Sequence, residues 1–285
     1  MLSTMFMLAK YASQTGVSLP EIMFWRQFVT LPMIAGWLLL TGNLHRLKTR
    51  RLGTHAIRAG VGLTGMVTTF GAAILLPLAQ ATTLGFTTPI FAVLLSVLVF
   101  REKVGPWRWA AVILGFIGVL IVTQPGHLPA SALGTAAGLA AGLMVAIISF
   151  QIRDLARTED PASVVFYFAL FGTVMVGLTL PFFATAHTGF QWLTLLAIGI
   201  VGTLAQLLLT AALRYGSVAT IIVMDYTALI WSTLYGWLIW NQFPPSTTWL
   251  GAPAILAAGG IIAWREHRAG RIAMARTQAE ARAEV

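Results

Sequence analysis

The chain has no cysteine and few charged residues. Of its 285 residues, 9% are charged and 58% are hydrophobic. A soluble domain usually has about a quarter charged residues, so this composition excludes a water-soluble protein. The absence of cysteine excludes disulfides, thiolate nucleophiles and cysteine metal ligands. The five histidines fall in expected loops or at span ends, which argues against a haem or proton-relay histidine in the membrane interior.

Motifs for ATP use and catalysis are also missing. The sequence has no P-loop glycine run, so we do not expect ATP to drive the protein directly. Acidic residues outside the expected spans accompany cations and show no metal-ligand spacing. These residues are Glu102, Asp154, Glu159, Asp160, Glu266, Glu280 and Glu284. We therefore expect neither an enzyme nor a bound cofactor or metal.

Long apolar segments dominate the sequence. A helix needs about 20 apolar residues to cross the hydrocarbon core, whereas barrel strands would alternate in polarity, so these segments predict helices. We expect an all-α membrane protein with ten transmembrane helices. Their ranges are Met1–Ser13, Ile22–Thr41, Ala56–Leu76, Ala79–Phe100, Trp107–Thr123, Leu133–Gln151, Ala162–Ala184, Trp192–Leu213, Ser217–Trp240 and Trp249–Trp264.

Basic residues occupy alternate connections between these spans. One set, which begins with His45–Arg58, holds together with the C-terminal tail every Lys and Arg except Lys10 and Arg26. The connections of the other set hold none. Because basic connections stay in the cytoplasm, this pattern predicts a multi-pass inner-membrane protein with both termini cytoplasmic. The net charge of +9 therefore indicates contact with lipid headgroups and not with nucleic acid.

A weak internal repeat divides the chain. Phe100 to Glu102 lines up with Trp240 to Gln242, and glycine pairs follow in both copies. We expect a first repeat over residues 1–125, a second over 126–266 and a basic tail over 267–285. Each repeat holds five spans, an odd number, so the second copy must be inverted, which is typical of transporters.

The first span is short for a membrane crossing. Its 13 residues (Met1–Ser13) cover only about 20 Å as a helix. We therefore expect that the first helix is shortened at its N-terminus and that the natural start lies upstream.

Three charged residues lie inside expected spans. Asp225 lies about 13 Å deep, where a carboxylate must face the protein interior or a wet cavity. It could be a proton-coupling site, an anchor for a cationic substrate or a structural partner of a buried cation. Lys10 and Arg26 lie at similar depth, so they require an anion, a cavity or snorkelling to the interface. Glu21 is a candidate partner for Arg26.

Polar residues of the fourth and ninth spans are further candidates for a substrate site. Gln80, Thr83 and Thr87 share one helix face, which Phe91 extends, and such a stripe suits a cavity wall or interhelical hydrogen bonds. Pro89 predicts a kink that could act as a gate. In the ninth span, aromatic and hydroxyl side chains surround Asp225 and would suit a flat or cationic metabolite. These side chains are Tyr226, Trp231 and Ser232.

Gly134, Gly138 and Gly142 recur at four-residue intervals in the sixth span. Small residues at this spacing let helices approach closely. We expect packing inside the bundle, with a homodimer contact as the alternative.

Several motifs together resemble the EamA-type branch of the drug/metabolite transporter superfamily. They are Lys10-Tyr11 with Glu21 to Arg26, Pro77 to Ala81 with Thr88-Pro89, Glu102 before Gly105, Gly115 to Gly118, and Asp225 to Thr227 ahead of Gly236. The first group looks most like S-adenosylmethionine uptake members, and the last also looks like riboflavin-type members. The resemblance implies ten helices around a central substrate cavity. Gln242 departs from the family, which usually has Glu at this position.

These observations favour a secondary transporter that moves a small polar or amphiphilic metabolite by alternating access. The substrate class would be amino-acid-like, S-adenosylmethionine-like or flavin-like, and transport could be proton-coupled or by exchange. The alternatives are a membrane enzyme or a flippase subunit acting on lipid-linked substrates. The sequence leaves the substrate, the direction of transport and the coupling ion open.

Overall fold

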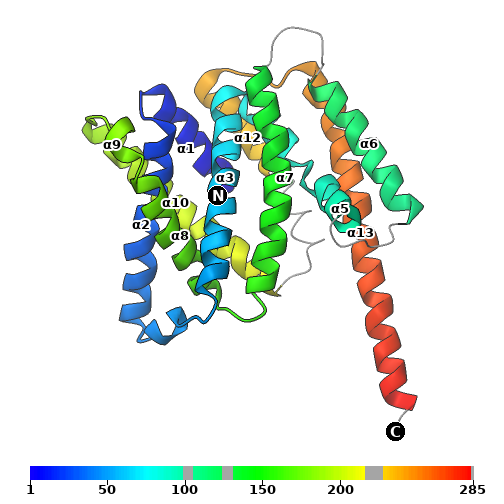
Figure 1. The fold of residues 1–285 in the computed structure, drawn as a ribbon. Helices are drawn as coiled ribbons and strands as arrows, with labels where there is room; N and C mark the ends of the chain where they lie inside the picture. The colour runs from blue at the N-terminus through cyan, green and yellow to red at the C-terminus, as the bar shows by residue number, and fades with distance from the viewer. Residues whose placement is uncertain (99–104, 124–130, 216–226, 284–285) are drawn as a thin grey trace.

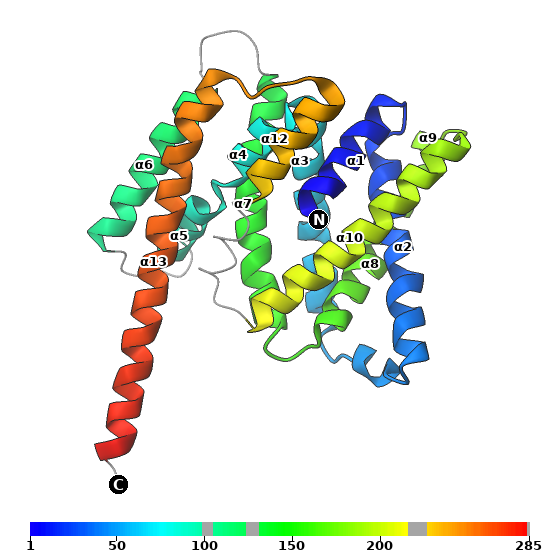
Figure 2. The same ribbon diagram turned by 180° about the vertical axis from the view of Figure 1, so that it is seen from behind.

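The computed structural model describes residues 1–98, 105–123, 131–215 and 227–283. Throughout these residues the regular structure is helical, without a strand (Figures 1 and 2). This confirms the predicted all-α class.

The helices follow one another with short connections. Those of the first half are α1 (Leu2–Gln14), α2 (Leu19–Leu40), the 3-10 helix η1 (Leu44–Leu47), α3 (Leu52–Leu75), α4 (Leu78–Gly85), α5 (Thr88–Leu98) and α6 (Pro106–Thr123). Those of the second half are α7 (Ala132–Leu155), α8 (Pro161–Gly177), α9 (Leu180–Phe183), α10 (Gly189–Tyr215), α12 (Thr227–Trp240) and α13 (Ser246–Ala283).

Among the described residues, five helices are long and apolar enough to cross a membrane. They are Leu19–Leu40, Leu52–Leu75, Leu78–Leu95, Ala132–Leu155 and Gly189–Ala212. Shorter apolar helices cover Trp109–Val122, Pro161–Gly177 and Ser246–Ile262. Large apolar side chains such as Phe182 and Leu250 lie exposed on the outside of the bundle, as lipid contact requires.

The helix contacts form pairs that correspond when the two halves are exchanged. Taking α1, α2, α3, α4–α5 and α6 as equivalent to α7, α8, α10, α12 and α13, the α3–α7 contact corresponds to α10–α1. In the same way α2–α10 corresponds to α8–α3, and α4–α7 to α12–α1. The α2–α8, α4–α12 and α6–α13 contacts correspond to themselves. This contact pattern is the one expected of two five-helix repeats related by a pseudo-twofold axis.

The two ends of the bundle differ in charge. We call the end with η1 and the α7–α8 connection the basic face, because Arg46, Arg51 and Arg157 lie there (bottom of Figure 1). The opposite end, with the α1–α2 turn, α9 and the α12–α13 connection, is called the neutral face. Beyond the bundle α13 continues on the basic side, so the expected tail is helical through Ala283.

Capping residues fix where α2 and α8 begin. Ser18 and Glu21 form a capping box at the start of α2, each side chain bonded to the other residue's backbone N–H. Asp160 caps α8 by accepting a hydrogen bond from the Ala162 N–H, 2.9 Å away, and Pro161 occupies the first position. Both helices therefore begin with an acidic residue close to the helix N-terminus.

The helix that contains Pro89 is interrupted just before this residue. α4 ends at Gly85 and α5 begins at Thr88, because proline provides no N–H for the preceding turn. Threonine hydroxyls donate to carbonyls at the break: Thr87 to Leu84 O (2.6 Å) and Thr88 to Gly85 O (2.8 Å). The interruption thus leaves these carbonyls hydrogen-bonded inside the bundle.

Candidate functional site

A cavity of about 350 Å³ lies between the two repeats. Its walls come from α1, α2, α3, α4 and α5 of the first repeat and from α7, α8, α10 and α12 of the second. Pockets for small metabolites usually measure about 300–1,000 Å³. The volume and the position between the repeats therefore suit a small organic ligand.

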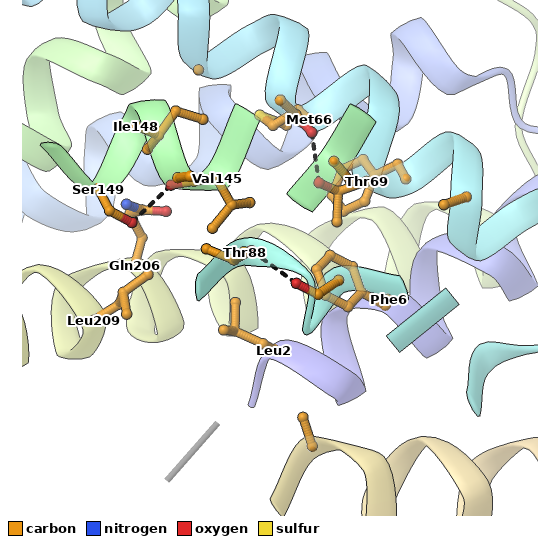
Figure 3. Close-up of a pocket in the computed structure, with 18 of the residues that line it drawn as sticks. Leu2, Phe6, Met66, Thr69, Thr88, Val145, Ile148, Ser149, Gln206 and Leu209 are labelled. Atoms are coloured by element: carbon orange, nitrogen blue, oxygen red, sulfur yellow. Dashed lines mark hydrogen bonds between the residues drawn. The ribbon is translucent and has the colours of Figure 1, made fainter. Parts of the chain in front are cut away.

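Most of the cavity wall is apolar, and its hydroxyl groups are already engaged (Figure 3). Thr69 donates to the Gly65 carbonyl (2.6 Å), and Ser149 donates to the Val145 carbonyl (2.7 Å). Each of these bonds stays within its own helix. The donors available to a ligand must therefore come mainly from other side chains.

Arg58 contributes such donors from α3. The expected cytoplasmic connection His45–Arg58 is wrong at its end, because α3 begins at Leu52 and places Arg58 in its second turn. The residue is only 2% exposed and lines the cavity. Gly62 and Met66 follow at four-residue intervals on the same face and line the cavity too.

Arg26 reaches the cavity from α2. It lies 4% exposed and donates to Gln27 Oε1 (2.5 Å) and to Gln206 Oε1 of α10 (3.2 Å). Its Nε is buried without a hydrogen-bond partner. The guanidinium thus bridges the two repeats and keeps an unused donor.

One aromatic ring contacts both guanidiniums. The Cζ of Arg58 lies 4.3 Å from the ring centroid of Phe168 in α8, and the Cζ of Arg26 lies 5.4 Å from it. Cation–π contacts of this kind contribute about 0.5–2 kcal/mol each. They stabilise the charges, but they leave the Nε and Nη1 donors of Arg58 without hydrogen-bond acceptors.

Within the described part of the chain, no ion pair joins either guanidinium to a carboxylate. Glu21, the expected partner of Arg26, instead pairs with His187, with 3.0 Å between Oε1 and Nε2. A buried charge without a counter-charge costs several kcal/mol. The arginine pair is therefore the most polar and least compensated part of the cavity wall.

Two glycines make room for the arginines. A Cβ atom at Gly62 would lie 2.6 Å from Phe168 Cε2 and would also clash with the Arg58 guanidinium. A Cβ atom at Gly202 would lie 3.1 Å from Arg26 Cγ. An arginine in an apolar helix, four residues before a glycine, is the sequence signal that could have pointed to Arg58.

Lys10 lies outside the cavity wall. Its Nζ donates to the Leu76 carbonyl at the end of α3 (2.5 Å) and lies 5.4 Å from the centroid of the Trp240 ring. The side chain is 4% exposed. Lys10 therefore ties α1 to the α3–α4 connection.

The candidate residues of α4 and α5 lie on the side of these helices opposite the cavity, with one exception. Thr87 and Phe91 pack against Gly142 of α7, and the Thr83 hydroxyl bonds the Ala79 carbonyl (2.8 Å). Gln80 is buried and does not line the cavity. The adjacent face lines it instead, through Thr82, Gly85, Thr88 and the predicted kink residue Pro89.

Ser232 lies one layer behind the cavity, where its hydroxyl accepts a hydrogen bond from Thr82 Oγ1 (2.7 Å). Trp231 is 50% exposed on the outside of α12 and faces away from the interior. Asp225 and Tyr226 lie outside the described residues.

The glycine stripe of α7 packs inside the bundle. Gly134 contacts Leu76, Gly138 contacts Leu84, and Gly142 contacts Thr87 and Phe91. The stripe thus serves the close approach of α7 to α3, α4 and α5.

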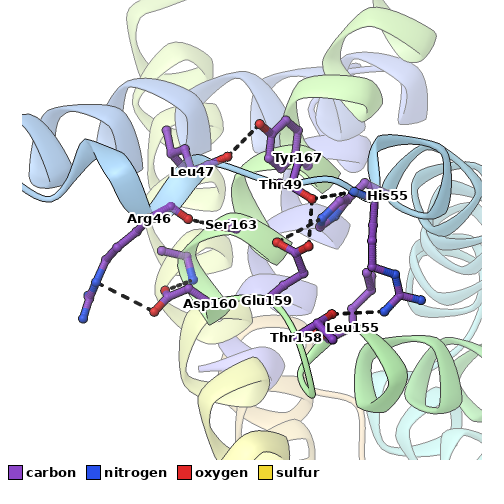
Figure 4. Close-up of polar contacts among 12 residues, drawn as sticks. Arg46, Leu47, Thr49, His55, Leu155, Thr158, Glu159, Asp160, Ser163 and Tyr167 are labelled. Atoms are coloured by element: carbon purple, nitrogen blue, oxygen red, sulfur yellow. Dashed lines mark hydrogen bonds and ion pairs between the residues drawn. The ribbon is translucent and has the colours of Figure 1, made fainter.

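A buried carboxylate and a histidine join the repeats at the basic face (Figure 4). Glu159, before α8, lies 3.9 Å from His55 Nε2 in the first turn of α3 and accepts a hydrogen bond from Thr49 (2.8 Å). Tyr167 of α8 donates to the Leu47 carbonyl of η1 (2.8 Å). These contacts close the basic end of the contact between α3 and α8.

A second such cluster lies at the neutral face. Besides His187, the Glu21 carboxylate accepts hydrogen bonds from the backbone N–H groups of Ser18 (3.0 Å) and Thr185 (2.8 Å). The His187 ring lies edge-on to Trp192, which in turn contacts Trp25. This cluster closes the neutral end of the contact between α2 and α10.

The chain matches the EamA-like transporter family twice, over residues 1–124 and 132–264. It is similar to a riboflavin transporter of Vibrio cholerae, with 29% identity over 92% of this chain and 89% of the relative. A pseudopaline exporter of Pseudomonas aeruginosa is 29% identical over 90% and 89%. An S-adenosylmethionine uptake transporter of Rickettsia bellii is 26% identical over 87% and 85%.

Proposed function

Because the chain belongs to the EamA-like transporter family, we propose that it is a secondary transporter that moves a small polar or amphiphilic metabolite by alternating access. The observation that carries this proposal is the cavity between the repeats, which both repeats line. The family and its named relatives are transporters and not enzymes.

The exchange symmetry of the helix contacts supports an alternating mechanism. Two inverted repeats can adopt packings of similar energy that expose a shared cavity to opposite sides of the membrane. Residues 1–125 and 126–266 would be the two moving units, as the sequence predicts. Arg26 and Gln206, which bond each other across the cavity, would change their contact during the movement.

The distribution of basic residues supports an orientation in the inner membrane. The basic face carries arginines on η1, on the residues before α3 and on the α7–α8 connection, and such segments stay cytoplasmic. We therefore place the basic face and both chain termini in the cytoplasm. The long helix α13 would then extend into the cytoplasm and bring the basic tail close to anionic lipid.

The energy source would be an ion gradient or exchange, since the sequence has no P-loop. Asp225 remains our candidate for proton coupling, because a carboxylate in an apolar span must serve a partner or a wet path. The relatives act in opposite directions, as uptake transporter and exporter, so family membership leaves the direction of transport open.

Reconstitution into proteoliposomes tests the proposal. Riboflavin and S-adenosylmethionine are the first probes, because relatives are named for them, and counterflow with internal unlabelled probe detects exchange. We expect saturable uptake of at least one probe, and loss of its proton dependence in Asp225→Asn. Arg157→Gln, which changes an exposed arginine beyond α7, is the matched control. Absence of uptake and counterflow for both probes would contradict the proposed substrate class.

A further inference from the structure

We propose that the substrate of this cavity is an organic anion, and that Arg26 and Arg58 bind its carboxylate or phosphate group. This inference rests on the proposed function, because it assigns the substrate class of the same cavity. Neither the family description nor the names of the relatives specify the charge of a ligand.

Unused hydrogen-bond donors provide the first argument. Arg58 Nε and Nη1 and Arg26 Nε are buried and have no hydrogen-bond partner, although both residues line the cavity. Buried donors in proteins are almost always paired with an acceptor. An oxyanion of the ligand would supply acceptors, and guanidinium groups bind carboxylate and phosphate with geometry that matches their planar fork.

The charge of the wall provides the second argument. Among the described residues that line the cavity, Arg26, Arg58 and Arg153 are cationic and none is Asp or Glu. Opposite charges attract more strongly in an apolar cavity than in water. The wall therefore favours an anionic ligand over a neutral or cationic ligand of the same shape.

The cavity also shows what the rest of the ligand is like. Beyond the arginines, the wall is formed largely by apolar side chains such as Phe6, Met66 and Val145 (Figure 3). An apolar or aromatic body would lie against them, while its charged end faces Arg26 and Arg58. This arrangement indicates an amphiphilic organic anion and not a bare inorganic ion.

Matched ligand pairs test the inference with the full-length protein in detergent. Riboflavin 5′-phosphate against riboflavin varies a phosphate, and indole-3-acetate against indole-3-acetamide varies a carboxylate, on unchanged apolar bodies. In titration calorimetry we expect the anion of at least one pair to bind about tenfold more tightly or better than its neutral counterpart. The pair that discriminates identifies the oxyanion.

Variants of Arg58 assign the effect to the arginine pair. We expect Arg58→Gln to lose the preference for the anion, and Arg58→Lys to keep part of it because the charge remains without the fork. Arg157→Gln should keep the full preference, because it removes an exposed arginine far from the cavity wall. If Arg58→Gln does not fold, the salt dependence of the wild type replaces it: added salt should weaken the anion and not the neutral ligand.

Equal affinity within both pairs, no binding of any of the four probes, or a preference that survives in Arg58→Gln would overturn the inference. Failure of the inference differs visibly from failure of the transport proposal. Uptake of neutral riboflavin without discrimination between the pairs would leave transport intact and remove only the anion site. Binding of anions without uptake would do the reverse.

Discussion

The two faces of the bundle are closed by the same kind of contact, made with different strength. At the neutral face Glu21 of α2 pairs with His187 before α10, and at the basic face Glu159 before α8 pairs with His55 of α3. Exchange of the repeats relates α2 to α8 and α10 to α3. The two pairs are therefore counterparts, and each joins one repeat to the other.

The surroundings of the two pairs differ. The Glu21–His187 distance is 3.0 Å, and the carboxylate accepts further bonds from two backbone N–H groups. The Glu159–His55 distance is 3.9 Å, and neither nitrogen of the buried His55 ring has a hydrogen-bond partner. The neutral face is thus fastened more firmly, and we expect the basic face to open with less cost.

Removal of the neutral-face pair should have the largest effect. Glu21→Ala leaves His187 and the Ser18 and Thr185 N–H groups without their acceptor, and we expect a loss of about 3 kcal/mol in the free energy of unfolding. Denaturation of the purified protein in detergent measures it. Gln191→Ala is the control at the same face, because the hydrogen bonds of Gln191 are exposed.

Removal of the basic-face pair should cost less. Glu159→Gln weakens the long contact with His55 but keeps a group that can accept from Thr49, so we expect a loss of about 1 kcal/mol. Combination with His55→Ala in a double-mutant cycle gives the coupling energy of the pair. A coupling as large as that between Glu21 and His187 would contradict the ranking of the two faces.

The smallest effect is expected at the surface of the basic face. Arg51 pairs with Asp154, whose side chain is 55% exposed, so water screens the interaction. Asp154→Asn should change the free energy of unfolding by about 0.5 kcal/mol or less in the same denaturation assay. A loss comparable to that of Glu159→Gln would mean that exposed contacts, and not the buried pair, hold this face together.

The helices and their order were predictable because continuous apolar segments have one stable form in lipid. The break before Pro89 follows from the missing backbone donor. The cavity-facing side of that helix was not predictable in the same way. Threonine stripes satisfy their own backbone, so the polarity of Thr83 and Thr87 does not show which neighbour they face.

The arginine pair and the Glu–His pairs illustrate a second limit. Arg58 looks like part of a basic connection until the helix start at Leu52 is known. Glu21 and His187 lie far apart along the chain, and no local pattern links them. Such contacts depend on how the repeats are placed against each other, which hydropathy and charge counts do not contain.

The ring of Phe168 belongs to the second repeat, whereas the arginines that rest on it belong to the first. A shift of one repeat against the other would therefore change how well the ring screens the two charges. The same residues would then grip cargo more tightly in one state than in the other. Loading and unloading could be driven by the sliding of one phenyl group, with no exchange of binding residues.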